Sequence, residues 1–226
     1  MLKSIFLLIL VVTSSLSVAN EVNIYTSRHY DSDDQLYEDF RKETGIKINV
    51  ISGNGSALLE RLKSEGANSP ADVFFTVDAG NLWKIQKEGY FQSISSSKAL
   101  SIVPKNLRGP NNEWIAIAKR ARVIFYNPDN VSNEEIKDLR YENLADKKWS
   151  NRIVIRSSNN IYNQSLVASL ISTHGIDETE LWAKGLISNF ARKPQGNDRS
   201  QIMAVASGIA DIAIANSYYY GYMLSG

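Results

Sequence analysis

Apolar and polar residues alternate along the first part of the chain in a pattern that predicts strands and helices in turn. The predicted strands are residues 22–26, 46–51 and 72–77, and the predicted helices are residues 33–43, 56–65 and 81–88. Leu58, Leu59 and Leu62 share one helical face, and Gly45 and Gly89 follow predicted helices as end signals. The 72–77 stretch is apolar enough for a buried strand. Three strand–helix units in succession predict a mostly parallel sheet covered by helices.

The pattern changes after the third predicted helix. Serine, proline and glycine make residues 92–112 typical of loops. Strand-like residues then occur at 114–118 and 122–126, and the second strand ends at the turn signal Asn127-Pro128-Asp129. A further set of elements follows, with strands at 153–155 and 212–215 and helices at 162–173 and 178–190. We therefore predict an α/β protein of two lobes that are joined near residues 115–125.

The N-terminus has the pattern of a secretory signal peptide over residues 1–19. Lys3 supplies a positive charge, Ile5 to Val12 form an apolar core, and Ser17-Val18-Ala19 form a cleavage site of small residues. The apolar core is far shorter than the roughly 20 residues that a membrane-spanning helix needs. We expect cleavage after Ala19 and a soluble, unanchored protein in the periplasm.

The composition argues against several classes of function. No cysteine is present, so disulfides and thiolate metal sites are excluded. A net charge of +1 with well-mixed signs argues against a nucleic-acid partner. No nucleophile-elbow, phosphate-loop, zinc-protease or dinucleotide-binding motif occurs, and the only histidines are His29 and His174. We expect a protein that is not an enzyme and has no catalytic residues.

Tyrosine is the unusual feature of the composition. Eleven are present, and Tyr218, Tyr219 and Tyr220 are consecutive, directly after the predicted strand that ends at Ala215. Three neighbours on a helix cannot all face one core, since they are about 100° apart. Side chains at the carboxyl end of a strand in an open α/β sheet project toward the usual ligand crevice. An aromatic patch at a surface or between lobes is the alternative interpretation.

Two more tyrosines follow predicted strands in the same way. Tyr30, preceded by His29, comes after the first strand, and Tyr162 begins a helix after the strand at 153–155. A helix N-terminus favours an anionic group, so a phenolate at Tyr162 is physically reasonable.

Three segments of the sequence, TSRHY, ARVIFYNP and GNDRSQIMAVASGIADIAIANSYYYG, carry a family resemblance. Together they resemble the periplasmic ferric-iron-binding proteins of ABC importers, transferrin-like solute-binding proteins, and in particular their cyanobacterial branch. The resemblance implies a type II periplasmic binding protein, with lobes at residues 20–118 and 119–226. It also implies a monomer that carries Fe(III) as cargo to a permease in the inner membrane. The metal ligands that it implies are His29, Tyr30, Tyr162, Tyr218 and Tyr219, with Tyr220 outside the site and Arg122 as a supporting cation.

The chemistry of phenolate suits this cargo. Ferric iron is a small, hard cation that prefers anionic oxygen ligands. Ionising one tyrosine at pH 7 costs roughly 4 kcal/mol, or about 16 kcal/mol for four, and only a highly charged ion offsets that cost. Four phenolates and one Fe(III) carry a net charge of −1, which Arg122 would compensate. The alternative for Arg122 is a solvated cation at the end of a strand.

Other functions stay open at this point. A binding protein of the same fold for a small organic or oxyanion solute is the nearest alternative, and an exported enzyme that uses Tyr30 or Tyr162 as an acid or nucleophile is a more distant one. The chain ends at Gly226, whereas the family it resembles continues well beyond the tyrosine run. We therefore expect both lobes to lack their C-terminal part and to expose apolar surface.

Overall fold

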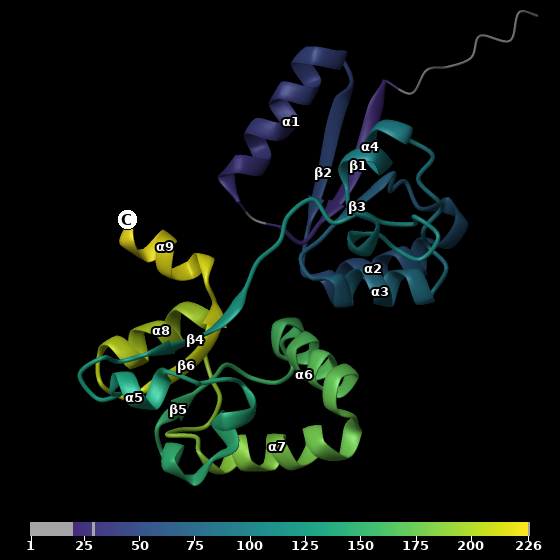
Figure 1. The fold of residues 1–226 in the computed structure, drawn as a ribbon. Coiled ribbons are helices and arrows are strands. Elements are labelled where there is room, and N and C mark those ends of the chain that lie inside the picture. The colour runs from purple at the N-terminus through teal and green to yellow at the C-terminus, as the bar shows by residue number, and fades with distance from the viewer. Residues whose placement is uncertain (1–19, 29, 226) are drawn as a thin grey trace, which may run out of the picture. The chain divides into compact units, whose positions relative to one another are not determined.

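The computed structural model describes residues 20–28 and 30–225, which form two compact units (Figure 1). The first unit runs to Val77 and the second begins at Asp78. The predicted signal peptide, residues 1–19, lies outside the described residues. The predicted lobe boundary between residues 118 and 119 stays a prediction.

The first unit contains a parallel three-stranded sheet in the order β2-β1-β3. Its elements are β1 (Glu21–Thr26), α1 (Asp31–Thr44), β2 (Lys47–Ser52), α2 (Gly55–Glu65), a 3₁₀ turn (Gly66–Asn68) and β3 (Val73–Phe75). In the register, Ile24 of β1 lies opposite Val50 of β2 and Val73 of β3. The parallel sheet predicted from the alternation of strands and helices is confirmed.

The core of the first unit forms where α2 covers the sheet. Leu58, Leu59 and Leu62 are buried on one face of α2, as their spacing predicts. Tyr25 of β1 is fully buried, and its hydroxyl donates to the Glu65 carboxylate at 2.7 Å. The prediction of a buried strand over 72–77 is wrong in extent and burial, because β3 has three residues and Val73 is 45% exposed.

The second unit contains a mixed three-stranded sheet in the order β4-β6-β5. β4 (Arg122–Tyr126) runs antiparallel to the central β6 (Ile212–Asn216), and β5 (Ile153–Val154) runs parallel to it. All five residues of β6 are buried. The main hydrophobic core packs on this strand and includes the fully buried Leu144 and Trp149. The placement of β6 at the centre explains why its first four residues, Ile212 to Ala215, are all apolar.

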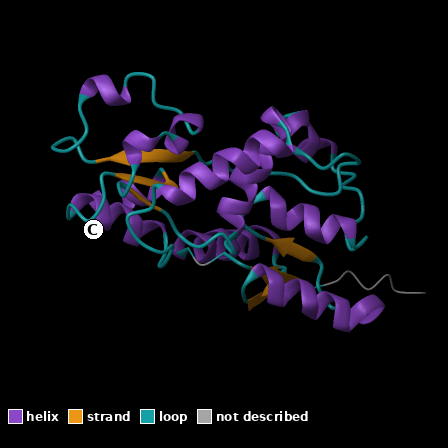
Figure 2. Cartoon of the chain, turned by 90° about the horizontal axis from the view of Figure 1, so that it is seen from below, coloured by secondary structure: helices purple, strands orange, loops and turns teal. Residues whose placement is uncertain are grey.

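Helices make up most of the regular structure of the second unit (Figure 2). They are α3 (Ala79–Lys87), α4 (Ser97–Ile102), α5 (Asn133–Ile136), α6 (Ile161–His174), α7 (Ile176–Ser188), α8 (Asp198–Ala206) and α9 (Tyr218–Leu224), with 3₁₀ turns at Lys105–Leu107, Glu142–Ala145 and Lys147–Trp149. Within the described part of the chain, every helix is too short or too polar to cross a membrane.

Several predictions for the second unit are wrong in detail. Residues 114–118 do not form a strand, since Ile115 makes only an isolated bridge with Arg108. Residues 92–112 are not all loop, because α4 lies within them. α8 and α9 are absent from the prediction. Large apolar side chains are exposed in both units, among them Val50 and Leu181.

Candidate metal site

Tyr218 and Tyr219 lie together directly after the central strand of the second unit. β6 ends at Asn216, and α9 begins at Tyr218. The two phenol rings have centroids 4.3 Å apart, and both side chains are half-buried. Tyr220 is different, because it is 49% exposed and its ring faces Phe125 at 5.9 Å. The tyrosine run therefore presents two adjacent phenols and a third on another side of α9, as the helical turn dictates.

Tyr162 occupies the start of α6, as the sequence predicts. The side chain of Asn160 caps this helix and accepts a hydrogen bond from the Tyr162 backbone N–H at 3.0 Å. Tyr162 is 8% exposed. Its ring is surrounded by the guanidinium groups of three arginines, whose Cζ atoms lie 4.4 Å (Arg120), 5.4 Å (Arg156) and 6.0 Å (Arg122) from the ring centroid. Such contacts are cation–π interactions, with the guanidinium groups close to the aromatic face.

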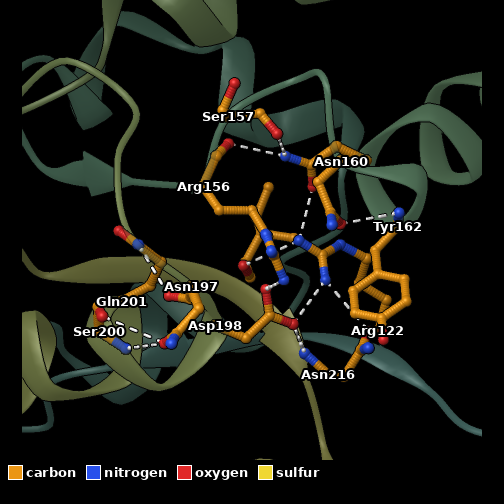
Figure 3. Close-up of polar contacts among 12 residues, drawn as sticks. Arg122, Arg156, Ser157, Asn160, Tyr162, Asn197, Asp198, Ser200, Gln201 and Asn216 are labelled. Carbon is orange, nitrogen blue, oxygen red and sulfur yellow. Dashed lines mark hydrogen bonds and ion pairs between the residues drawn. The ribbon is translucent and has the colours of Figure 1, made fainter. Parts of the chain in front are cut away.

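Arg122 lies at the centre of a polar network (Figure 3). Its Nη1 donates to Asp198 Oδ2 at 2.9 Å and to Asn216 Oδ1 at 3.1 Å, and its Nη2 donates to Asn163 Oδ1 at 2.6 Å. Its side chain is only 10% exposed, so the interpretation of Arg122 as a solvated cation is wrong. Asn163 directly follows Tyr162, and Asn216 precedes Tyr218 by two residues. Arg122 therefore connects the helix end that carries one tyrosine with the strand end that leads to the other two.

Arg120 is held in place by an ion pair with Asp78. The Nη2 atom of Arg120 lies 2.6 Å from Asp78 Oδ2, and the other carboxylate oxygen accepts from the hydroxyl of Ser165 on α6. Asp78 has a positive φ of 73° and caps α3 through the Gly80 N–H at 2.9 Å. Gly80 lies close to α6, because a Cβ there would lie 2.9 Å from Ile161 Cδ1 and 3.1 Å from Ser165 Oγ, so these side chains would have to shift. α3 therefore approaches the start of α6 closely beside Tyr162.

The charges around Tyr162 sum to a positive value. Arg120, Arg122 and Arg156 contribute three positive charges, and their partners Asp78 and Asp198 contribute two negative ones, which leaves +1. The side chains of both carboxylates are at most 10% exposed, so solvent screens these pairs only weakly. This excess is opposite in sign to the −1 of four phenolates with one Fe(III).

Tyr30 belongs to the first unit and follows β1, as predicted. It occupies the N-cap position of α1, and the Cζ of Arg28 lies 5.1 Å from its ring centroid. Arg28 is fixed by two hydrogen bonds to the Asp33 carboxylate, at 2.9 and 2.7 Å, which raise the pKa of the arginine. His29 lies outside the described residues. That His29 and Tyr30 bind the same metal ion as the tyrosines of the second unit stays a prediction.

A partly buried tyrosine, Tyr141, holds the backbone of Arg122. The hydroxyl of Tyr141 donates to the backbone carbonyl of Arg122 at 2.6 Å, and burial raises the pKa of Tyr141 to about 12. Tyr141 thus remains neutral and keeps its donor over the physiological pH range.

Among the described residues, no cluster of three or more histidine, aspartate or glutamate side chains is arranged to hold a metal ion.

Sequence reasoning missed the carboxylates and two of the arginines in these networks. Asp78, Asp198, Arg120 and Arg156 carry no motif of their own, and their partners are distant in the sequence. The one local signal is the Asn197-Asp198 pair, which is typical of a helix start and does begin α8.

Comparison with known proteins identifies the class. Residues 68–223 match the family model described as bacterial extracellular solute-binding protein. The chain belongs to this family. The predicted resemblance to extracellular binding proteins is therefore confirmed.

Individual relatives narrow the comparison further. The chain is 55% identical over 204 residues to "Iron uptake protein A1" of Synechocystis, covering 90% of this chain and 56% of that protein. A Trichodesmium protein solved in complex with iron and citrate ligands is 58% identical, with a TM-score of 0.82, and the match covers 88% of this chain and 62% of that one. The apo form of FutA2 from Synechocystis is 47% identical, with a TM-score of 0.84 and coverage of 92% and 64%. The predicted α/β fold of a type II periplasmic binding protein is confirmed, and the chain spans between half and two thirds of the length of these relatives.

Proposed function

We propose that this chain binds ferric iron through tyrosine phenolates and delivers it to an ABC permease of the inner membrane. The observation that carries the proposal is the pair Tyr218 and Tyr219, with rings 4.3 Å apart at the end of a buried central strand. Relatives that are 55% and 58% identical are an iron uptake protein and a protein solved with iron and citrate.

The proposed ligands are those that the family resemblance implies. They are His29, Tyr30, Tyr162, Tyr218 and Tyr219, gathered from lobes at residues 20–118 and 119–226. The protein would act as a monomer in the periplasm after cleavage of residues 1–19, without nucleic acid as a partner and without enzymatic activity. Arg122 would support the site without touching the metal.

The surroundings of Tyr162 support a trivalent cargo bound by phenolates. Metal binding displaces a proton from each ligating phenol, so the site then carries several negative charges. The three arginines and their two aspartate partners carry a net charge of +1. The Cζ atom of each arginine lies within 6.0 Å of the Tyr162 ring centroid. The arginines are themselves engaged by carboxylates, so they favour compensation of a phenolate cluster over capture of a free oxyanion.

Iron retention by purified protein tests the proposal. Metal-free protein is incubated with ferric citrate, freed of small molecules on a desalting column and assayed for iron. We expect the wild type to retain stoichiometric iron and Tyr218→Phe to retain much less, because phenylalanine keeps the ring and removes the ligand oxygen.

Tyr220→Phe is the matched control, since Tyr220 is adjacent but exposed and faces Phe125. It should retain iron like the wild type. Absence of retained iron in the wild type, with binding of a small organic or oxyanion solute in its place, would favour a same-fold binding protein for that solute.

A further inference from the structure

Asp198 is a fully buried carboxylate that the ligand set does not use. It is the first residue of α8, follows the N-cap Asn197, and has 0% exposure. An ionised carboxylate so placed is costly unless it is both paired and hydrogen-bonded. Each of its two oxygen atoms has such partners, and all of them lead to the predicted ligand tyrosines.

The arginine partners of Asp198 lead to Tyr162. Oδ2 lies 2.9 Å from Arg122 Nη1, and Oδ1 lies 3.3 Å from Arg156 Nη1. The guanidinium groups of these two arginines lie 6.0 and 5.4 Å from the Tyr162 ring centroid. Figure 3 shows the carboxylate between the two arginines, with Tyr162 beside Arg122. Asp198 thus fixes two of the three cations around that ring.

The backbone partner of Asp198 leads to the other tyrosines. Oδ2 also accepts from the Asn216 N–H at 2.9 Å. Asn216 is the last residue of β6, and the chain then turns through Ser217 into the helix that begins at Tyr218. This hydrogen bond therefore fixes the direction in which the chain leaves the sheet toward Tyr218 and Tyr219.

From this geometry we infer that Asp198 is a positioning residue for the metal site. It aligns Tyr162 with Tyr218 and Tyr219 by holding the start of β4, the loop before α6 and the end of β6 to the start of α8. The inference rests on the proposed function, and it adds a residue that touches no metal but orients the groups that do. Substitution of outer partners of this kind typically lowers metal affinity about 10- to 100-fold.

The test compares Asp198→Asn with a matched control at the other end of the same strand. Asp211 directly precedes β6, pairs with Arg152 at 2.5 Å and accepts from Asn130 Nδ2 at 2.8 Å, and its side chain is 17% exposed. Asp211→Asn weakens a more exposed ion pair, with side chains 23% and 17% exposed, at the end of the strand away from the tyrosines. For both variants the ferric affinity, the iron–phenolate absorption band and the thermal unfolding midpoint are measured beside the wild type.

We expect Asp198→Asn to bind ferric iron about 10- to 100-fold more weakly and to shift the absorption band, whereas Asp211→Asn loses thermal stability with wild-type affinity and band. Wild-type binding by Asp198→Asn, or equal losses of affinity in the two variants, would overturn the inference.

Arg156→Gln is the substitute test if Asp198→Asn does not fold. It leaves the Asp198–Arg122 pair and should still shift the band, and an unshifted band contradicts the inference. Failure of the wild type to bind iron would instead overturn the proposed function, and the inference with it.

Discussion

Arg122 and Asp198, separated by 76 positions in the sequence, form an ion pair of 2.9 Å with side chains that are 10% and 0% exposed. The pair connects the first residue of β4 to the first residue of α8. In this environment the interaction resists screening, and the loss of one partner leaves a charge buried without full compensation. The pair is therefore a determinant both of the stability of the second unit and of the position of its tyrosines.

Arg122→Met should destabilise the protein substantially. We expect the free energy of unfolding to fall by about 3 kcal/mol, at the low end of the range for breaking a buried pair because Arg156 still partners Asp198. Urea denaturation followed by tryptophan fluorescence measures the change.

Arg199→Met is the control for that substitution, since Arg199 is exposed and lies 4.7 Å over the ring of Tyr222. A loss of about 0.5 kcal/mol or less is expected for this surface change. Equal losses in the two variants would contradict the assigned role of the buried pair.

Tyr141 should make the free energy of unfolding depend on pH in the alkaline range. Its pKa in the folded protein is about 12 because the phenol is buried, compared with 10.0 for an unperturbed tyrosine. The folded state thus favours the neutral phenol. This contribution is complete below about pH 10 and is lost as the pH rises toward 12.

Tyr141→Phe removes that contribution together with the hydrogen bond to the Arg122 carbonyl. The difference in the free energy of unfolding between wild type and variant should narrow as the pH rises from about 9 to 11.5. A difference that stays constant over this range would show that Tyr141 does not titrate differently in the two states.

Reduction should weaken cargo binding. Ferrous iron carries one charge fewer than ferric iron, so the same phenolates attract it less and offset less of the cost of their own ionisation. Competition titrations with a chelator, under aerobic conditions and under anaerobic conditions with ascorbate, measure the two affinities. Tighter binding of the ferrous ion would count against a phenolate site.

The elements that the sequence predicts correctly are those in which apolar residues repeat along one buried face. The leucines of α2 are an example, because Leu58, Leu59 and Leu62 repeat at helical spacing and all pack inward. The buried face of α8 carries polar as well as apolar residues, since Asp198 and Gln201 share it with Ile202 and Val205, so no clear apolar stripe marks this helix. The prediction of a strand at residues 114–118 is wrong for a different reason, since strand composition does not reveal whether a neighbouring strand exists to pair with it.

The sequence predicts where the candidate tyrosines lie in the fold better than it predicts the charged residues around them. The position of Tyr218 follows from the apolar strand before it, and that of Tyr162 from the polar loop and helix around it. The burial of Asp198 depends on Arg122 and Arg156, which are 76 and 42 positions away. Only the folded chain brings such partners together, so no local pattern distinguishes this aspartate from a solvated one.

The visible absorption spectrum tests the central claim most directly. Ferric iron bound by phenolate absorbs visible light through charge transfer from the ligand to the metal. Colourless metal-free protein mixed with stoichiometric ferric citrate near neutral pH should develop such a band. The band should be weaker in Tyr218→Phe and should fade as the pH is lowered, because protons compete with iron for the phenol oxygens. A sample that stays colourless, with a spectrum equal to the sum of its separate components, would contradict the binding of iron by tyrosine.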